Sequence, residues 1–355
     1  MNSLALNTRD RSTAIGVGLV IVVGLVLLLS RLFTPLDSLT RGWLVAFAMW
    51  SSIPIGSVLL LAIHRLTGGT WGFAMAPVLR PAAALMPLVA IAFLPIVLAL
   101  PAVYPWAADP ASTNADVVRL YLNTPFFVTR AAVALIGWSF LGIVLATGRG
   151  GQLVAALGLA FHGLIISLVA VDWYLSVDAG YTSTAFAAMI SIQQILAALA
   201  FVAVIGAPAL DGKAAGDLGG LMIASLLGVV YIEFMTFLIA WYGDLPDKAS
   251  WYVDRSTTGW VVVLVIAVVL GALIPFGILL VRAARCSRFG VRIAGGLVLI
   301  GSALHFAWLL VPSFDSEAGP IIVACLALCV LTIVALIIGS DLAPAPRQRE
   351  TSHAG

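Results

Sequence analysis

The chain has 355 residues, of which 62% are hydrophobic and 10% carry a charged side chain. Soluble domains are about half apolar and about a quarter charged, so this composition excludes an ordinary soluble protein and places most of the chain in a lipid bilayer. The formal net charge of +2 gives no argument for binding nucleic acid.

About ten apolar runs are long enough to cross a membrane, because a helix needs about 20 apolar residues to span the hydrocarbon core. Isolated strands are excluded there, since their backbone groups would lack partners. We therefore expect an all-α polytopic membrane protein with about ten transmembrane helices. The runs cover residues 12–30, 43–63, 82–104, 127–147, 151–171, 184–206, 220–242, 259–281, 290–311 and 319–339.

The third run contains several prolines. Pro81 stands just before the run, where the first turn of a helix tolerates proline. Pro87, Pro95 and Pro101 lie inside the run, where proline removes a backbone hydrogen bond and crowds the preceding turn. We therefore expect a kinked third membrane helix. The loop that follows, 105–126, is expected to form a short amphipathic helix on the membrane surface.

The positions of Lys and Arg predict the orientation of the chain. If the N-terminus is cytoplasmic, most basic residues fall on the inner side, including the cluster RAARCSRFGVR at 282–292. Cytoplasmic loops carry an excess of Lys and Arg, so we expect a multi-pass protein of the bacterial inner membrane with both termini inside. Aspartate and tryptophan gather in the loops expected outside. The polar stretch 341–355 is expected to be a disordered cytoplasmic tail.

The cysteines give no sign of a redox centre. The chain has three cysteines, and none of them forms the Cys-x-x-Cys pair used by iron–sulfur clusters or covalent haem. The loops between the apolar runs are too short to form a soluble cofactor domain. We expect no metal and no directly bound cofactor, and any redox centre would belong to a partner.

Polar side chains near the middle of three apolar runs are the strongest functional candidates, because polar and ionisable groups at membrane depth are costly. Removal from water disfavours a charged carboxylate, so we expect the acid in this set to exchange protons, with Tyr231 and Thr236 extending its path. The alternative is a protonated acid that only bonds a neighbouring helix. The central polar residues are His162, Gln193, Gln194 and Glu233.

Three further candidate residues lie nearer the outer side. Asp172 and Trp173 end the fifth run, and they either take part in chemistry or serve as a helix cap and an aromatic anchor. His305 lies toward the outer end of the ninth run. A haem shared by His162 and His305 is geometrically possible, but it is disfavoured because the two histidines lie at different depths.

Three motifs carry a resemblance to a known family. They are HRLTGGTWG at 64–72, DWYLS at 172–176, and the pattern W-Y-x-x-L-P-x-x-x-x-W-Y-x-x-R from Trp241 to Arg255. Together with the helix count, they make the chain similar to the NrfD/PsrC-like membrane subunits of polysulfide and nitrite reductases. Within that family the chain most resembles the ActF-type subunits of alternative complex III, a quinol:cytochrome c oxidoreductase.

The resemblance implies a fold and a set of partners. Members of this family bind no metal or haem, and their core is two four-helix bundles. Quinol oxidation takes place in a paralogous ten-helix membrane subunit, beside an iron–sulfur protein and cytochrome c subunits, and a proton path has been suggested through ActF-type subunits. The implied segments are 1–42 with the first membrane helix, 43–183 and 184–312 as the two bundles, 313–340 with the last helix, and the tail 341–355.

The chain departs from the family pattern at three positions that matter for proton conduction. Met235 and Thr236 stand where a Ser-Gln pair is common, and His305 lies in a region that often carries an aspartate. These departures leave the fold expectation intact. They also raise the alternative of a diverged, purely structural subunit.

Residues and resemblance together give one leading hypothesis: a cofactor-free membrane subunit of a quinol:electron-acceptor oxidoreductase that anchors redox subunits and conducts protons, with quinol or quinone handled through the complex. A proton-coupled secondary transporter and a purely structural scaffold are the alternatives. The proton-path candidates are His162, Asp172, Gln193, Gln194, Tyr231, Glu233, Thr236 and His305. The outer-face interface candidates are Trp173, Asp178, Trp241, Asp244, Trp251, Tyr252 and Arg255.

Overall fold

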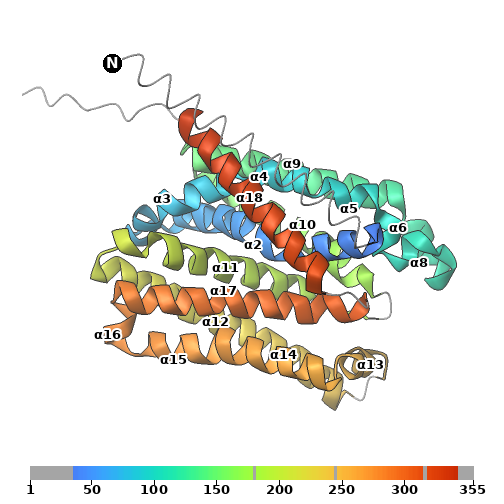
Figure 1. Cartoon of the computed structure of the whole chain (residues 1–355). Coiled ribbons are helices and arrows are strands. Elements are labelled where there is room, and N and C mark those ends of the chain that lie inside the picture. The colour runs from blue at the N-terminus through green and yellow to red at the C-terminus, as the bar shows by residue number, and fades with distance from the viewer. Residues whose placement is uncertain (1–34, 179–180, 244–245, 315–317, 343–355) are drawn as a thin grey trace, which may run out of the picture.

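The computed structural model describes residues 35–342, except 179–180, 244–245 and 315–317. The predicted first membrane helix at 12–30 and most of the predicted tail lie outside this part of the chain. The described residues form helices joined by turns and short loops (Figure 1). The expectation of an all-α polytopic membrane protein is confirmed.

Eight helical stretches among the described residues are long and apolar enough to cross a membrane. A further helix, α18 (Ala318–Leu342), covers the last apolar run predicted from the sequence. The eight stretches are Leu36–Thr67 (α2), Thr70–Leu98 (α3 to α5), Thr124–Ala146 (α9), Gln152–Val177 (α10 to η3), Phe186–Ala209 (α11 and η4), Gly212–Tyr242 (α12), Thr258–Leu280 (α14 to α15) and Arg288–Ser313 (α17 and η6).

The third predicted helix is broken at its prolines, as expected. It consists of α3 (Thr70–Ala84), α4 (Met86–Ala92), α5 (Leu94–Leu98) and α6 (Leu100–Val103). Each of the last three begins with a proline at its first or second position, where the missing N–H costs least. The expectation for Pro81 was wrong, because α3 begins earlier and contains this proline.

Short elements connect the long helices at the end predicted to face outward. The surface helix expected in the 105–126 loop is present as α8, Ala115–Leu120, and none of its residues is buried. The other connecting elements are α7 (Pro105–Ala108), η1 (Pro110–Ser112), α13 (Pro246–Asp254) and, at the opposite end, α16 (Arg282–Arg285).

The long helices pack in two groups that meet along α2 and α11. In the first group, α2 contacts α3, α9 and α10, and α9 also contacts α3 and α10; in the second, α17 contacts α11, α12, α14 and α15. Between the groups, α2 packs directly on α11, and α18 also packs on α2, crossing in front of it in the view of Figure 1. The predicted division of the chain into segments stays a prediction.

Glycines allow the closest helix crossings. A side-chain carbon on Gly56 of α2 would overlap the carbonyl oxygen of Gln194 in α11, and one on Gly301 of α17 would overlap the backbone of Gly271. Small residues of this kind let membrane helices approach closely, where van der Waals packing replaces the hydrophobic effect.

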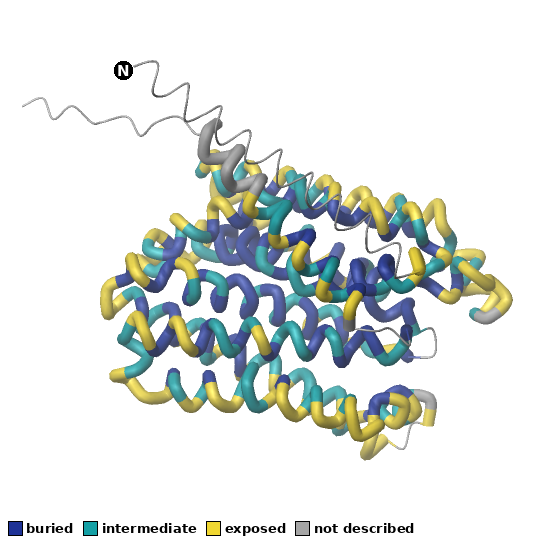
Figure 2. Tube along the Cα trace, in the orientation of Figure 1, coloured by how far each residue is buried: buried dark blue, intermediate teal, exposed yellow. Residues whose placement is uncertain are grey.

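Burial is uneven between the two groups. In the most apolar 18-residue segment of α2, 83% of the residues are buried. The corresponding share is 17% for α12 and 11% for the α14–α15 crossing. Figure 2 shows this contrast as a dark centre along α2 and α11 and an exposed row along α14 and α15. The outer helices of the second group therefore face lipid or another protein.

Candidate functional site

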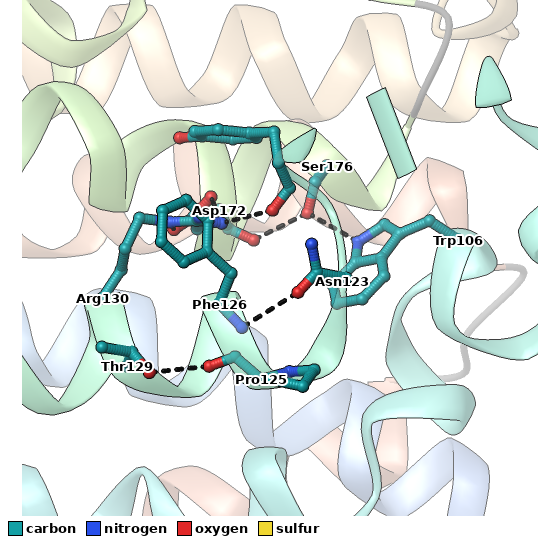
Figure 3. A network of polar contacts seen from close by, with 9 residues as sticks. Trp106, Asn123, Pro125, Phe126, Thr129, Arg130, Asp172 and Ser176 are labelled. Atoms are coloured by element: carbon teal, nitrogen blue, oxygen red, sulfur yellow. Dashed lines mark hydrogen bonds and ion pairs between the residues drawn. The ribbon is translucent and has the colours of Figure 1, made fainter. Parts of the chain in front are cut away.

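A buried ion pair lies in the first helix group, near its predicted outer end. The Nε of Arg130 in α9 donates to Oδ2 of Asp172 at 2.5 Å, and its Nη2 donates to Oδ1 at 2.9 Å (Figure 3). The side chains are 7% and 1% exposed. Two parallel bonds of this kind fix both groups and are the strong form of the pair.

Local backbone geometry aims Asp172 at its partner. The end of α10 (Gln152–Val169) widens into a π-helical turn, η2 (Ala170–Tyr174), followed by η3 (Leu175–Val177). Ser176 donates to the Asp172 backbone oxygen and accepts from the indole of Trp106 (Figure 3). Turns of this type often occur at functional positions.

Aromatic rings enclose the guanidinium of this pair. Arg130 lies 4.0 Å from the ring centroid of Tyr121 and 4.6 Å from that of Phe126. Burial raises the pKa of the Tyr121 phenol to about 12, and the nearby Asp172 carboxylate adds to the shift. The expectation that Asp172 ends a proton path is not supported by this geometry, because the carboxylate is held on both oxygens by Arg130.

A second polar cluster lies in the second helix group and joins three helices. Nε2 of His305 in α17 lies 2.9 Å from Oε1 of Glu233 in α12. On the other side of the ring, the amide of Gln193 in α11 donates to Nδ1 of His305 at 3.1 Å. We name Gln193, His305 and Glu233 the polar triad.

The hydrogen bonds of the triad select one histidine tautomer. An amide nitrogen can only donate, so Gln193 leaves Nδ1 of His305 unprotonated and places the ring proton on Nε2, toward Glu233. The contact between Nε2 and Oε1 is short, but its angles fall outside those of a good hydrogen bond. Two titratable groups thus lie within reach of each other, and a small rotation of either side chain would align them for a hydrogen bond.

A cavity of about 430 Å³ gives access to the triad. It lies between α12 and α14 (Thr258–Val268), with α11 and α17 behind. The residues of its walls include all members of the triad, together with Ser302, Trp308 and Arg255. Most of the remaining wall is aliphatic or aromatic, so the polar triad is the hydrophilic part of a mainly apolar chamber.

Arg255 closes the cavity toward the predicted outer end. Its guanidinium donates to the backbone oxygen of Leu309 at 3.1 Å and to Oγ of Ser313 at 2.7 Å, and lies 3.6 Å from Asp178. It also lies 3.7 Å from the ring centroid of Trp251. These contacts tie the loop before α14 to the end of the helix that carries His305.

Two of the predicted central residues lie elsewhere. His162 is buried in α10, and its Nε2 lies 2.9 Å from Oγ of Ser191. Gln194 is buried where α11 crosses α2, beneath Gly56. Adjacent residues on a helix point in different directions, so of the two glutamines only Gln193 faces His305.

Tyr231 and Thr236 do not extend the triad, contrary to the expectation. Tyr231 is 63% exposed on α12, because a residue two positions from Glu233 lies on another side of a helix. The Thr236 hydroxyl donates to the backbone oxygen of Ile232 in its own helix at 2.8 Å. Sequence proximity to Glu233 was therefore a poor guide to contact.

Several residues predicted to form an outer interface are part of the core instead. Trp173 is completely buried and packs on Phe93 with 4.3 Å between ring centroids. Trp251 and Arg255 are 6% and 3% exposed, so they offer no surface to a partner. Of the other candidates, Trp241 is exposed, Tyr252 and Asp178 are half-buried, and Asp244 lies outside the described residues.

Sequence reasoning missed the roles of Arg130 and Trp308. Arg130 was not among the predicted site residues, although an arginine several residues inside an apolar run, as in FFVTRAAVAL, is itself a signal for a buried partner. Trp308 follows His305 by three positions, which places both on one face of α17. Their rings stack at 5.9 Å between centroids.

Comparisons with known proteins leave the family open. No protein-family model matches the chain, and no curated protein matches it. Among the described residues, no group of three His, Cys, Asp or Glu side chains is placed to hold a metal ion.

Proposed function

We propose that the chain is a membrane subunit of a quinol:electron-acceptor oxidoreductase of the bacterial inner membrane. It has no redox centre of its own, anchors redox subunits, and passes protons through its second helix group. The motif resemblance supports the assignment to this class of complex. The observation that carries the proton role is the polar triad, with its His305–Glu233 contact of 2.9 Å inside a membrane-embedded cavity.

The triad has the chemistry that proton transfer needs. Glu233 and His305 are both able to bind and release a proton, and ionisable residues facing the interior of a helix bundle commonly form proton relays. Gln193 fixes the ring orientation of His305, so the exchangeable proton lies between imidazole and carboxylate. The cavity beside the pair provides a route for a proton to arrive or leave.

The partners in this proposal are a paralogous ten-helix membrane subunit, an iron–sulfur protein and cytochrome c subunits. The exposed faces of α12 and the α14–α15 span are large and apolar, and such a face suits lipid or another membrane helix equally well. Electrons would pass through the partner subunits, while this chain contributes anchoring and proton transfer.

A transporter receives less support from the geometry. Inverted-repeat transporters carry broken helices at matching positions of their two halves. Here the π-helical turns are η2, at the end of the fourth crossing of the first group, and η5 (Val269–Leu273), within the third crossing of the second. The two π-helical turns therefore lie in crossings that do not match each other between the two groups.

The test uses the complex purified from native membranes through a tag on this chain. The preparation should contain iron–sulfur and c-type cytochrome subunits and oxidise quinol. In liposomes, Glu233→Gln should lower the number of protons moved per electron while assembly is retained, because glutamine cannot exchange the proton. The matched control is Tyr231→Phe, which alters an exposed side chain two positions away and should leave the ratio unchanged.

An unchanged proton ratio in the assembled Glu233→Gln complex would remove the triad from the mechanism and leave the scaffold role. A tagged chain that purifies without redox subunits or quinol oxidation would overturn the assignment to this class of complex.

A further inference from the structure

Four arginines gather where two crossings of the second helix group end. The connector between the α14–α15 crossing and α17 carries α16 and lies at the end of the bundle opposite α8 and α13 (Figure 1). Arg282 and Arg285 are one turn apart on α16, and Arg288 and Arg292 are one turn apart at the start of α17. We name these four residues the arginine cluster.

Two arginines of the cluster are held in place by the start of α12 and the turn before it. The Nε of Arg288 donates to the backbone oxygen of Leu210 at 2.6 Å, and its terminal nitrogens have no hydrogen-bond partner among the described residues. The stem of Arg285 packs on Gly219 of α12, where a side-chain carbon would overlap its Cγ. Side chains that are already ordered lose less entropy when they bind a ligand.

Carboxylates do not neutralise the cluster. The part of the chain that the structure describes has four ion pairs, and none of them includes one of these arginines. The start of α12 adds Lys213, Asp211 and Asp217, and Asp211 already accepts from the backbone N–H of Ala214 at 2.7 Å as the helix cap. Five basic and two acidic side chains give this corner a net charge of +3, which attracts anions.

Large apolar side chains are exposed directly beside the arginine cluster. Val281 and Phe289 are 57% and 73% exposed, and Leu280 and Ile293 are also exposed. Phe289 follows Arg288 in a helix that is apolar and long enough to cross the membrane. An anion bound here therefore meets positive charge and lipid-facing side chains together. A phospholipid offers both a phosphate and acyl chains, whereas an acidic protein segment offers only the charge.

We propose that the arginine cluster binds the headgroup of an anionic phospholipid. The planar fork of arginine matches two phosphate oxygens, and Arg285 and Arg288 are the two residues already positioned to hold the phosphate. Arg282 and Arg292 add to the local positive charge, and the acyl chains lie against the exposed apolar side chains. An excess of basic residues is ordinary on the cytoplasmic side. Ordered stems, missing carboxylates and exposed apolar neighbours distinguish this cluster from that background.

A headgroup held in this way would join two membrane helices. Arg285 packs on α12, and Arg288 begins α17, so one phosphate between them ties α12 to α17. A ligand that binds only the folded protein raises its stability. We therefore expect the bound lipid to raise the Tm. The inference does not depend on the proposed proton role, because neither Glu233 nor His305 takes part in it.

The test places the full chain in nanodiscs that contain equal amounts of phosphatidylglycerol, which is anionic, and phosphatidylcholine, which is zwitterionic. Native mass spectrometry of the released chain counts the lipids that stay bound. We expect the chain to retain phosphatidylglycerol in preference to phosphatidylcholine, and to have a higher Tm in phosphatidylglycerol alone than in phosphatidylcholine alone. Neither inorganic phosphate nor a short polyglutamate peptide should displace the retained lipid.

Three glutamine substitutions separate the cluster from the general charge of this end of the protein. Arg285→Gln should weaken retention of phosphatidylglycerol about tenfold, as expected for the loss of a charge-assisted hydrogen bond. Arg282→Gln should weaken it as well, and because Arg282 is exposed its effect does not depend on packing against α12. The matched control is Arg149→Gln, which removes one exposed charge from the connector between α9 and α10 and should leave retention unchanged.

Equal retention of the two lipids would overturn the proposal, and so would an effect of Arg149→Gln as large as those of the two cluster variants. Displacement by inorganic phosphate would show a site for free phosphate instead. Displacement by the polyglutamate peptide would show a site for an acidic protein segment. Either displacement would contradict a lipid as the occupant.

Discussion

Asp172 and Glu233 are both buried acids, but their surroundings differ. Asp172 is held by two short bonds from Arg130 inside a shell of aromatic rings. Glu233 has one short contact, to His305, and faces a cavity. The first arrangement holds a carboxylate in place by two bonds, and the second leaves a carboxyl group beside a cavity. We therefore assign a structural role to Asp172, and the proposed proton transfer rests on Glu233.

Removing Arg130 should destabilise the protein strongly. In Arg130→Ala the Asp172 carboxylate stays buried without its partner, and breaking a buried pair in this way typically costs about 3–5 kcal/mol. We expect a large fall in the Tm of the protein in detergent. Arg119→Ala is the control, because this arginine pairs with Asp116 at the surface, where both side chains are more than 70% exposed. A Tm for Arg130→Ala equal to that of the control would contradict the assignment.

Arg255 should not contribute to pH dependence near neutrality. Burial lowers the pKa of its guanidinium to about 10, and the neighbouring Asp178 partly offsets the shift. Because the folded pKa lies below the unfolded value, the unfolded chain binds more protons between the two values, and the free energy of unfolding rises with pH only there. At lower pH the group is protonated in both states.

The measurement for this prediction is the pH profile of quinol oxidation by the complex. Arg255→Gln should lower the Tm, since the contacts to Leu309 and Ser313 are lost. The shape of the profile between about pH 6 and 9 should stay the same. Loss of an inflection in that range would show that Arg255 titrates there after all.

Close crossings at glycine define how the helices of the second group approach each other. Gly301 of α17 and Gly271 of η5 lie backbone to backbone, and both line the cavity. The cavity exists beside this contact because α14 stays close to α17 here while α12 stands apart. Helix packing therefore shapes the site as much as its polar residues do.

Adding a single methyl group at this crossing should be costly. In Gly301→Ala the new carbon would overlap backbone atoms of Gly271, which cannot move aside like a flexible side chain. Overpacking of this kind costs about 1–3 kcal/mol or more, so the Tm should fall. Gly296→Ala on the same helix is the matched control, because its new carbon would meet no atom within 4 Å. Equal Tm values for the two variants would contradict the crossing.

The helices themselves were largely predictable from the sequence, because length and apolarity alone mark a membrane crossing. The breaks at Pro87, Pro95 and Pro101 followed from the chemistry of proline. The early start of α3 at Thr70 could not be seen, because Gly72, Pro77, Arg80 and Pro81 interrupt the apolar stretch before the third run and make it resemble a loop. In the structure this stretch is helical and packs against α2.

The arrangement of the whole molecule decides which polar residues meet, and this was much harder to predict. Depth in the membrane correctly suggested that Gln193 and Glu233 lie at a similar level. It could not show that His305 joins them while His162 bonds Ser191, since rotation of each helix about its axis is set by its neighbours. The two groups joined at α2 and α11 fix those rotations.

The most direct test of the account asks whether Glu233 exchanges a proton. Infrared difference spectra of the full chain recorded in H2O and in D2O report the carbonyl stretch of protonated carboxyl groups, because this band shifts when the acid proton is exchanged for deuterium. The account predicts an exchange-sensitive band that is absent in Glu233→Gln, changes in His305→Gln, and stays unchanged in the exposed-site control Asp116→Asn. A band that persists unchanged in Glu233→Gln would contradict the central claim.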